Sequence, residues 1–496
     1  MHTGSKDSSS FVKYAALAFA VAALCLFAEW AATTAASGND IGAKVNPRTA
    51  VAGKGAAYVE GAARDYGAAA ANYNGLERYS AWENTNGEAA TYQPEGPFTA
   101  DNPFFRPLGT NGRACVTCHD PSAGWTITPA HVRMRFEASR GSDPLFRPVD
   151  GATCPAADVS TPAAMKKAYG LLLNKALIRI GIPIPRNAEF SVVKVDDPYH
   201  CTRLSGSKSG VLSVYRRPLQ ATNLRFEDTL MWDGRMPDLE HQANDAARGH
   251  EQAADGPMPD QLARLIEFET GTYDAQVRVP KAGSLQDGGV GGGPVALSRE
   301  PFFIGINDPF GNNPVDVQTS LHVFNLYDLW RGDPNPERAR IARGQAIFNA
   351  TPMIIGEVPG LDDAEGHPTH EGFCTTCHDT PNVGNRSINI LMNIGTADVT
   401  RRTPDMPLFT LRCDAGALKG QTFQVMDPGQ ALITGKCTDI ARFKTSSLRG
   451  LASRPPYFHD GQSATLMDVV NFYNDRFEIG LTAQEKEDLV AFLGTL

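Results

Sequence analysis

Two five-residue motifs in this chain combine a pair of cysteines with a histidine. They are Cys115-Val116-Thr117-Cys118-His119 and Cys374-Thr375-Thr376-Cys377-His378. The C-x-x-C-H spacing is the attachment signature of c-type haem, in which two thiols form thioethers with the porphyrin and the next residue is the proximal imidazole. A redox dithiol or half of a zinc site is the alternative for a single copy. Two copies favour two covalently bound haem c groups, attached at Cys115, Cys118, Cys374 and Cys377, with His119 and His378 as iron ligands.

The N-terminus has the pattern of a secretory signal. Lys6 and Lys13 precede a largely apolar run from Tyr14 to Ala32, and small residues follow. This order of charged, apolar and small residues predicts export to the periplasm, with cleavage near Ala36. The run is long for a signal, so an uncleaved anchor is the alternative, and only then would the protein be attached to a membrane.

Nine cysteines are present, and four remain after the haem motifs and Cys25 of the signal are set aside. An exported protein folds in an oxidising compartment, where four cysteines allow three pairings. The local pairing, Cys154 with Cys201 and Cys413 with Cys437, is the simplest. Free buried thiols are the alternative.

The composition describes a globular protein rich in loops. The chain has 496 residues, of which 42% are hydrophobic and 20% charged, with 47 glycines and 34 prolines. This length predicts two or three domains. The formal net charge of −9 argues against nucleic acid or anionic lipid as the main partner.

Helical patterns dominate the elements that we expect. Thr128, Asn335 and Thr482 look like N-caps of helices, and only residues 190–195 alternate clearly as a strand. Further helices are expected over 162–180 and, with an interruption at Gly256-Pro257, over 244–270. The region between the second motif and Arg442 is interpreted as loop that covers a haem. These patterns predict a mainly α fold with two haem modules and long loop insertions.

The expected domain organisation has five parts. They are a signal peptide or anchor (1–36), an N-terminal extension (37–100), a first haem domain (101–282), a Gly- and Pro-rich linker and interdomain segment (283–333), and a second haem domain (334–496).

Beyond the haem motifs, two stretches carry a resemblance. They are Met231-Trp232-Asp233-Gly234-Arg235 and, after Ser447-Leu448-Arg449, Pro456-Tyr457-Phe458-His459-Asp460-Gly461. With the two motifs they make residues 102–496 similar to the bacterial di-haem cytochrome c peroxidases and their relative MauG. The resemblance implies two cytochrome c-like domains facing each other, and often a homodimer.

The resemblance also assigns roles around the second haem. Trp232 would relay electrons between the haems, although a core tryptophan with a satisfied N–H is the alternative. Tyr473, fourteen residues after His459, would be the sixth ligand of the second haem, as in MauG-like proteins, whereas the peroxidases have methionine there. A phenolate stabilises ferric iron more than a thioether does. A buried aromatic on an amphipathic helix is the alternative for Tyr473.

On the distal face of the first haem the pattern is less regular. The family's acid–base glutamate falls at Gln252 by residue counting, and a shift of one position makes it Glu251, with His250 adjacent. Glu251 and His250 are therefore the candidate proton-transfer residues, and solvated helix side chains are the alternative. His131 and His200 are the candidates for the family's loop histidine, and an open, five-coordinate iron is an equal alternative.

A calcium ion between the domains is a further implication of the resemblance. In the family an asparagine ahead of the tryptophan motif contributes to that site. Arg217 stands at the corresponding position here, which puts calcium binding in doubt.

Three functions follow from these features. The first is an exported peroxidase that reduces hydrogen peroxide with electrons from a small donor protein, a c-type cytochrome or a cupredoxin, passed through the second haem. The second is a MauG-like oxidase acting on a protein or an organic substrate. The third is a non-catalytic electron-transfer cytochrome, against which the chain length argues, because carrying electrons needs no long insertions.

Overall fold

The computed structural model describes residues 75–314, 320, 322–362 and 369–496, all within one unit of the chain. The signal-like segment, Cys25 and residues 37–74 of the expected extension lie outside the described residues. Within the described ranges, no helix has both the length and the hydropathy needed to cross a bilayer.

Antiparallel strands form much of the described chain, so the prediction of a mainly α fold is wrong. One sheet has the order β10-β9-β3-β2, two others have the orders β5-β8-β7 and β14-β13-β6, and two ribbons pair β1 with β4 and β11 with β12. The strands are β1 Gly75–Leu76, β2 Tyr79–Asn84, β3 Gly87–Tyr92, β4 Phe98–Thr99, β5 Ile178–Pro183, β6 Phe190–Asp196, β7 Arg203–Gly206, β8 Ser209–Arg216, β9 Tyr273–Val279, β10 Gly283–Ser284, β11 Met353–Gly356, β12 Thr369–Gly372, β13 Leu408–Cys413 and β14 Thr422–Val425.

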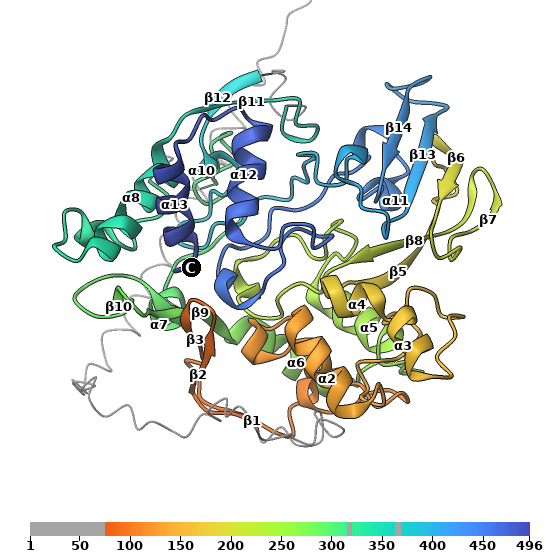
Figure 1. Cartoon of the computed structure of the whole chain (residues 1–496), viewed down its shortest axis with the longest axis horizontal. Coiled ribbons are helices and arrows are strands. Elements are labelled where there is room, and N and C mark those ends of the chain that lie inside the picture. The colour runs from red at the N-terminus through yellow and green to blue at the C-terminus, as the bar shows by residue number, and fades with distance from the viewer. Residues whose placement is uncertain (1–74, 315–319, 321, 363–368) are drawn as a thin grey trace, which may run out of the picture. The chain divides into compact units, whose positions relative to one another are not determined.

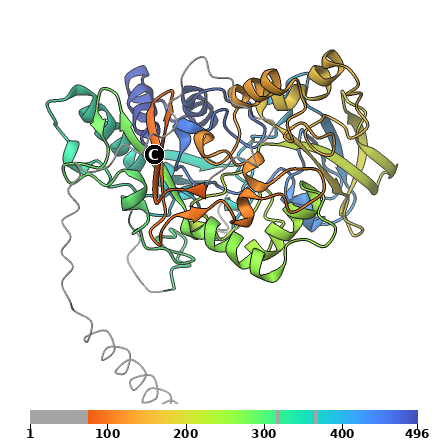
Figure 2. The same ribbon diagram turned by 90° about the horizontal axis from the view of Figure 1, so that it is seen from below.

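The sheet β14-β13-β6 shows why the loop interpretation of the region before Arg442 fails. In β13, Phe409, Leu411 and Cys413 are buried and the side chains between them are more exposed, which is the two-residue period of a half-buried strand. β13 pairs antiparallel with β6, the strand expected at 190–195. Strands that follow different haem motifs thus share one sheet, at the right of Figure 1. Figure 2 places the yellow and blue strands together from a second direction.

Helices form where capping residues predicted them. Thr128, Asn335 and Thr482 accept hydrogen bonds from the first-turn amides of α2, α8 and α13. The helix expected over 162–180 is correct only in part, because Ala176 adopts a left-handed conformation that ends α4 and β5 follows. The helices are α2 Pro129–Ser139, α3 Pro162–Ala168, α4 Gly170–Lys175, α5 Leu239–Gly249, α6 Pro259–Gly271, α7 Gly293–Leu297, α8 Pro336–Ala350, α10 Cys374–Cys377, α11 Ala431–Thr434, α12 Leu466–Arg476 and α13 Ala483–Leu493.

Helices α8, α10, α12 and α13 gather around the second motif (Figure 1). A Cβ atom at Gly344 of α8 would lie 2.0 Å from the carbonyl oxygen of Asp488 in α13, so glycine permits the close approach. Arg343 then donates to the Asp488 carboxylate at 2.7 Å. Phe348 and Phe492 belong to the apolar core between these helices.

Both disulfides of the local pairing are confirmed. Cys154 is bonded to Cys201 with a Cα–Cα distance of 5.4 Å, and Cys413 to Cys437 with 6.1 Å. Each bridge closes a loop in the part of the chain that follows one of the two motifs.

Replacing Cys154 and Cys201 with alanine is expected to lower the free energy of unfolding by about 4 kcal/mol, because a bridge over a long loop restricts the unfolded chain. The sequence separation of this pair is 47. The separation of Cys413 and Cys437 is 24. Removal of that second bridge is therefore expected to cost slightly less, about 3.5 kcal/mol. Urea unfolding of the haem-loaded protein measures both values, and a larger loss for the shorter loop would contradict the loop-entropy explanation.

Candidate functional site

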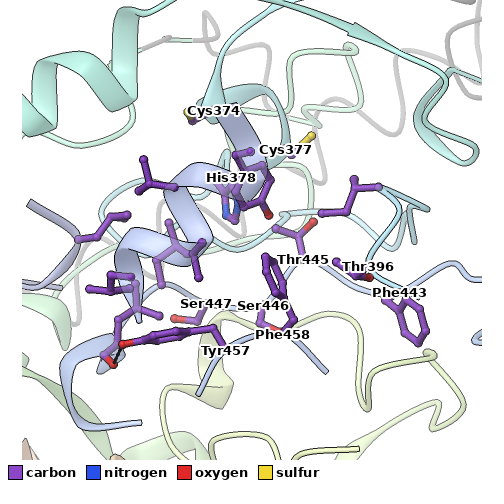
Figure 3. Close-up of a pocket in the computed structure, with 18 of the residues that line it drawn as sticks. Cys374, Cys377, His378, Thr396, Phe443, Thr445, Ser446, Ser447, Tyr457 and Phe458 are labelled. Atoms are coloured by element: carbon purple, nitrogen blue, oxygen red, sulfur yellow. Dashed lines mark hydrogen bonds between the residues drawn. The ribbon is translucent and has the colours of Figure 1, made fainter. Parts of the chain in front are cut away.

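Two cavities are each built around one C-x-x-C-H motif. The first is lined by Cys115, Cys118 and His119, and the second by Cys374, Cys377 and His378. The four motif cysteines form no disulfide with any described residue, although the other four described cysteines are paired. Figure 3 shows the thiols and imidazole of the second motif on one side of the cavity, with Ser446, Ser447, Tyr457 and Phe458 on the other.

The two motif histidines have the same orientation relative to their own chain. The Nδ1 atom of His119 lies 2.9 Å from the carbonyl oxygen of Trp125, and that of His378 lies 2.5 Å from the carbonyl oxygen of Gly384, six residues ahead in both cases. Burial lowers the pKa of each imidazole to about 4, so both rings are neutral. With Nδ1–H donated to the backbone, Nε2 is the nitrogen left to bind a metal.

A buried arginine supports each motif in the same way. Arg135 donates to the carbonyl oxygen of Thr117 at 2.7 Å, and Arg386 donates to that of Thr376, also at 2.7 Å. Each guanidinium also pairs with a buried aspartate. Because these contacts repeat around both motifs, the two sites are local structural equivalents.

The residues of both cavities fit haem c. Apolar side chains provide most of each lining, the thiols stand outside the disulfides of the described chain, and a neutral imidazole directly follows them. Burial raises the pKa of Cys118 to about 11 and that of Cys374 to about 12, so these two thiols are protonated rather than charged within the apolar sites.

Trp232 lies in a wall that the two cavities share. Its side chain lines both cavities, and its Nε1–H donates to the carbonyl oxygen of Arg217 at 2.8 Å. The amide of Arg217 in turn donates to the carbonyl oxygen of His459 at 2.8 Å. The tryptophan motif and the Pro456–Gly461 stretch are thus joined through one residue, and the indole N–H is satisfied.

Tyr473, on α12, lines the second cavity together with His378. Burial raises the pKa of its phenol above the ordinary value, and the nearby Cys377 and Cys374 thiols add to this effect. Its hydroxyl makes no hydrogen bond to any group in the described ranges, whereas the hydroxyl of Tyr457, in the same cavity, donates to the carbonyl oxygen of Leu451. The Tyr473 oxygen is therefore available to a ligand.

Glu251 lines the first cavity, whereas Gln252 is exposed and does not. The Oε2 atom of Glu251 accepts from the amide of Leu108 at 2.8 Å, and Oε1 lies 3.5 Å from the Cys115 sulfur. Burial raises the pKa of Glu251 to about 7. The structure thus places Glu251, and not Gln252, beside the first motif. Glu251 is the residue that a one-position shift in the residue count had indicated.

His250 also lines the first cavity, and its backbone and ring are both anchored. Its Nδ1 atom lies 2.6 Å from Asp150 Oδ2, and Asp150 is itself paired with Arg113 at 2.5 Å. Asn111 donates to the His250 carbonyl oxygen at 2.8 Å. His131, on α2, and His200, in an exposed turn, do not line this cavity.

The sequence interpretation missed Glu269, a second carboxyl group in the first cavity. It lies on α6, is 7% exposed, and its Oε2 atom has no hydrogen-bond partner in the described chain. Burial raises its pKa to about 8. A signal existed, because Glu269 follows Leu262 and Leu265 on the buried helix face at spacings of seven and four. Asp150 has no comparable signal, because it lies in a loop far from His250 in sequence.

Each of the two cavities contains the thiols and imidazole that a c-type haem requires. No family model matches the chain. It is 37% identical to cytochrome-c peroxidase IdrP1 of Pseudomonas sp. (strain SCT), over 57% of this chain and 68% of that protein. It is 24% identical to cytochrome-c peroxidase IdrP2 of Denitromonas iodatirespirans, over 58% and 69%. A solved MauG-like protein associated with microbial copper homeostasis is 17% identical with a TM-score of 0.30, covering 58% of this chain and 74% of that one.

The chain therefore belongs to the di-haem cytochrome c peroxidase and MauG family, and it is a peroxidase-type oxidoreductase with haem c as its cofactor.

Proposed function

We propose that this protein is exported to the periplasm, carries two covalently bound haem c groups, and reduces hydrogen peroxide in the first cavity. Electrons come from a small c-type cytochrome or cupredoxin and pass through the second cavity and Trp232. The observation that carries the proposal is the position of Trp232 in the wall shared by two cavities that each hold a complete set of two thiols and a neutral imidazole.

The first cavity supplies proton transfer beside the cofactor. Haem held by Cys115, Cys118 and His119 would supply the redox-active iron. The balance is one hydrogen peroxide, two electrons and two protons giving two waters. Glu251, as a carboxylate, accepts a proton from one peroxide oxygen and, as a carboxylic acid, returns a proton to the departing oxygen. A pKa of about 7 suits both steps near neutral pH.

Asp150 orients the second proton-transfer candidate. Its carboxylate, held by Arg113, accepts the Nδ1–H of His250 and fixes the tautomer in which Nε2 is the basic nitrogen. Through this arrangement His250 shuttles protons between solvent and the cavity, since its side chain is 34% exposed.

The MauG-like oxidase is the second candidate, and Tyr473 is the observation that favours it. A phenolate oxygen in the second cavity would lower the reduction potential there relative to a thioether, which makes that site a poorer store for a donor's electron. The electrons would then come from oxidation of a protein or organic substrate instead of from a small donor protein.

Peroxidase turnover distinguishes the two candidates. The haem content is first measured by the pyridine haemochrome assay, with two haems per chain expected. Peroxide-dependent oxidation of a reduced small c-type cytochrome is then followed by its absorbance. Rapid oxidation supports the peroxidase, whereas peroxide-dependent oxidation of an organic substrate without turnover of the cytochrome supports the oxidase. Absence of both activities in protein with full haem content refutes the proposal.

Replacing Tyr473 with phenylalanine is expected to remove the low-spin ferric signal of the second haem and raise its reduction potential, because an anionic oxygen ligand is lost. EPR and optical redox titration measure these changes. The matched control is Tyr457→Phe, since that hydroxyl is already bonded to a backbone carbonyl. Unchanged spectra in Tyr473→Phe refute ligation.

A further inference from the structure

The wall shared by the two cavities contains three cationic side chains: Arg217, Lys444 and Arg454 line both cavities. Arg217 and Lys444 are 5% and 8% exposed. Burying a cation costs several kcal/mol unless an anion or a set of hydrogen bonds compensates it. The contacts of each side chain therefore show whether an anion compensates its positive charge.

Of these three, Lys444 is the one with an anionic partner in contact among the described residues. Its ammonium group donates to Glu227 at 2.7 Å and to the carbonyl oxygen of Thr229 at 2.8 Å. This ion pair uses the carboxylate of Glu227, so that group does not compensate a second cation by direct contact.

Arg217 donates to backbone oxygens. Its Nη1 and Nη2 atoms donate to the carbonyl oxygens of Arg454 at 2.8 Å and Ile127 at 2.6 Å, and its Nε has no partner within the described ranges. Burial and the neighbouring Arg454 charge lower the pKa of Arg217 to about 9. The guanidinium is thus still charged at neutral pH. The charge beside it is the positive one of Arg454, and no carboxylate of the described residues contacts it.

Arg454 also donates to backbone oxygens and has no carboxylate in contact among the described residues. It donates to the carbonyl oxygens of Arg449 at 3.2 Å and Ser447 at 2.5 Å. Asp274 and Glu227 act on it only from beyond ion-pair distance, and burial raises the pKa of Asp274 to about 7. One buried guanidinium group, Arg217, and one partly buried one, Arg454, therefore face both cavities with no carboxylate of the described chain in contact.

We propose, resting on the function proposed above, that Arg217 and Arg454 form an anion site that binds haem carboxylates from both cavities. The ligand class follows from the two cavities themselves, because each fits a haem and haem carries two propionates. Guanidinium groups match carboxylates in geometry and remain charged. The fixed positive charge also makes a divalent cation unnecessary at this wall, and the described residues contain no cluster of three or more His, Cys, Asp or Glu side chains suited to one.

Reduction potentials test the site without reference to turnover. Removing a positive charge near both haems stabilises their ferric states. Arg217→Gln is therefore expected to shift both oxidation equilibria about tenfold toward the ferric form, equivalent to about 59 mV for one electron. Arg454→Gln is expected to shift both in the same direction, and Arg217→Lys to keep them within twofold of the wild type. Spectroelectrochemical titration of the haem-loaded protein measures these changes.

Controls separate this inference from the proposed function. Arg225→Gln removes a guanidinium that lines neither cavity, and no shift is expected. EGTA or added calcium is expected to leave both wild-type potentials unchanged. Unchanged potentials in both Arg217→Gln and Arg454→Gln, or a shift with EGTA, overturn the inference. A di-haem protein without peroxidase or oxidase activity refutes only the proposed function.

Discussion

Replacing Glu251 with glutamine is expected to lower kcat/KM for hydrogen peroxide by about 100- to 10,000-fold, the usual contribution of a positioned acid–base group. Glutamine keeps the size of the side chain and its bond from the Leu108 amide, but it cannot accept and return a proton. Stopped-flow measurement of the reaction with peroxide gives this value directly, because it does not depend on the electron donor.

The pH profile gives an independent test of the same role. Because Glu251 must be a carboxylate to accept a proton, kcat/KM is expected to rise with pH through about 7, the value to which burial raises its pKa, and then to level off. The rise is expected to disappear in Glu251→Gln. A variant that retained the wild-type rise would show that another group titrates.

Two carboxyl groups of α6 provide controls for this experiment. Glu267→Gln changes an exposed carboxylate outside the cavity, so wild-type kinetics are expected. Glu269→Gln changes the carboxyl group that lines the cavity and whose Oε2 atom has no partner among the described residues. If Glu269→Gln rather than Glu251→Gln loses activity and the pH-dependent rise, the acid–base role belongs to Glu269.

A large loss of stability is expected from Arg216→Met. Arg216 is fully buried and holds two carboxylates, Asp427 through two hydrogen bonds of 2.7 and 2.9 Å and Asp233 at 2.6 Å. Removing Arg216 leaves the buried Asp427 without a paired cation, whereas Asp233 keeps its ion pair with Arg235. An uncompensated buried charge costs about 3–5 kcal/mol in the free energy of unfolding. Denaturant unfolding of the haem-loaded protein measures the loss.

The loss is expected to depend on pH in a defined direction. Burial acts to raise the pKa values of Asp233 and Asp427, but the Arg216 guanidinium, joined at Asp233 by that of Arg235, outweighs it and holds both below their ordinary value. The wild type therefore gains stability from them above the pKa of an unfolded aspartate and loses it as the pH falls. In Arg216→Met the buried Asp427 loses its paired cation and protonates readily, so the destabilisation is greatest near pH 7 and smaller near pH 4.

The surface pair of Arg402 and Asp196 provides the comparison. Its side chains are 21% and 54% exposed. Because solvent screens such a pair, Arg402→Met is expected to cost less than about 1 kcal/mol. Equal losses in Arg216→Met and Arg402→Met would contradict the assignment of Arg216 as a buried clamp.

The sequence by itself determined the features that depend on short spacing. Two thiols and an imidazole in one short motif predict a haem site because the chemistry requires that separation. Thr128, Asn335 and Thr482 predicted helix starts because capping involves atoms within one turn. The disulfides followed from local pairing, and the family resemblance, through the spacing of Tyr473 from His459, predicted Tyr473 at the second haem.

The tertiary structure alone decided what depends on partners far apart in the chain. β13 is too short to be distinguished from loop until β6, which precedes the second haem motif, supplies its hydrogen bonds. The segment from Leu108 to Arg113 holds His250 and Glu251 toward the first cavity and leaves Gln252 exposed, a difference that residue counting could not resolve. Burial of Arg217 between two cavities is likewise invisible in the sequence, because a guanidinium has an unmet charge only where packing excludes both water and carboxylates.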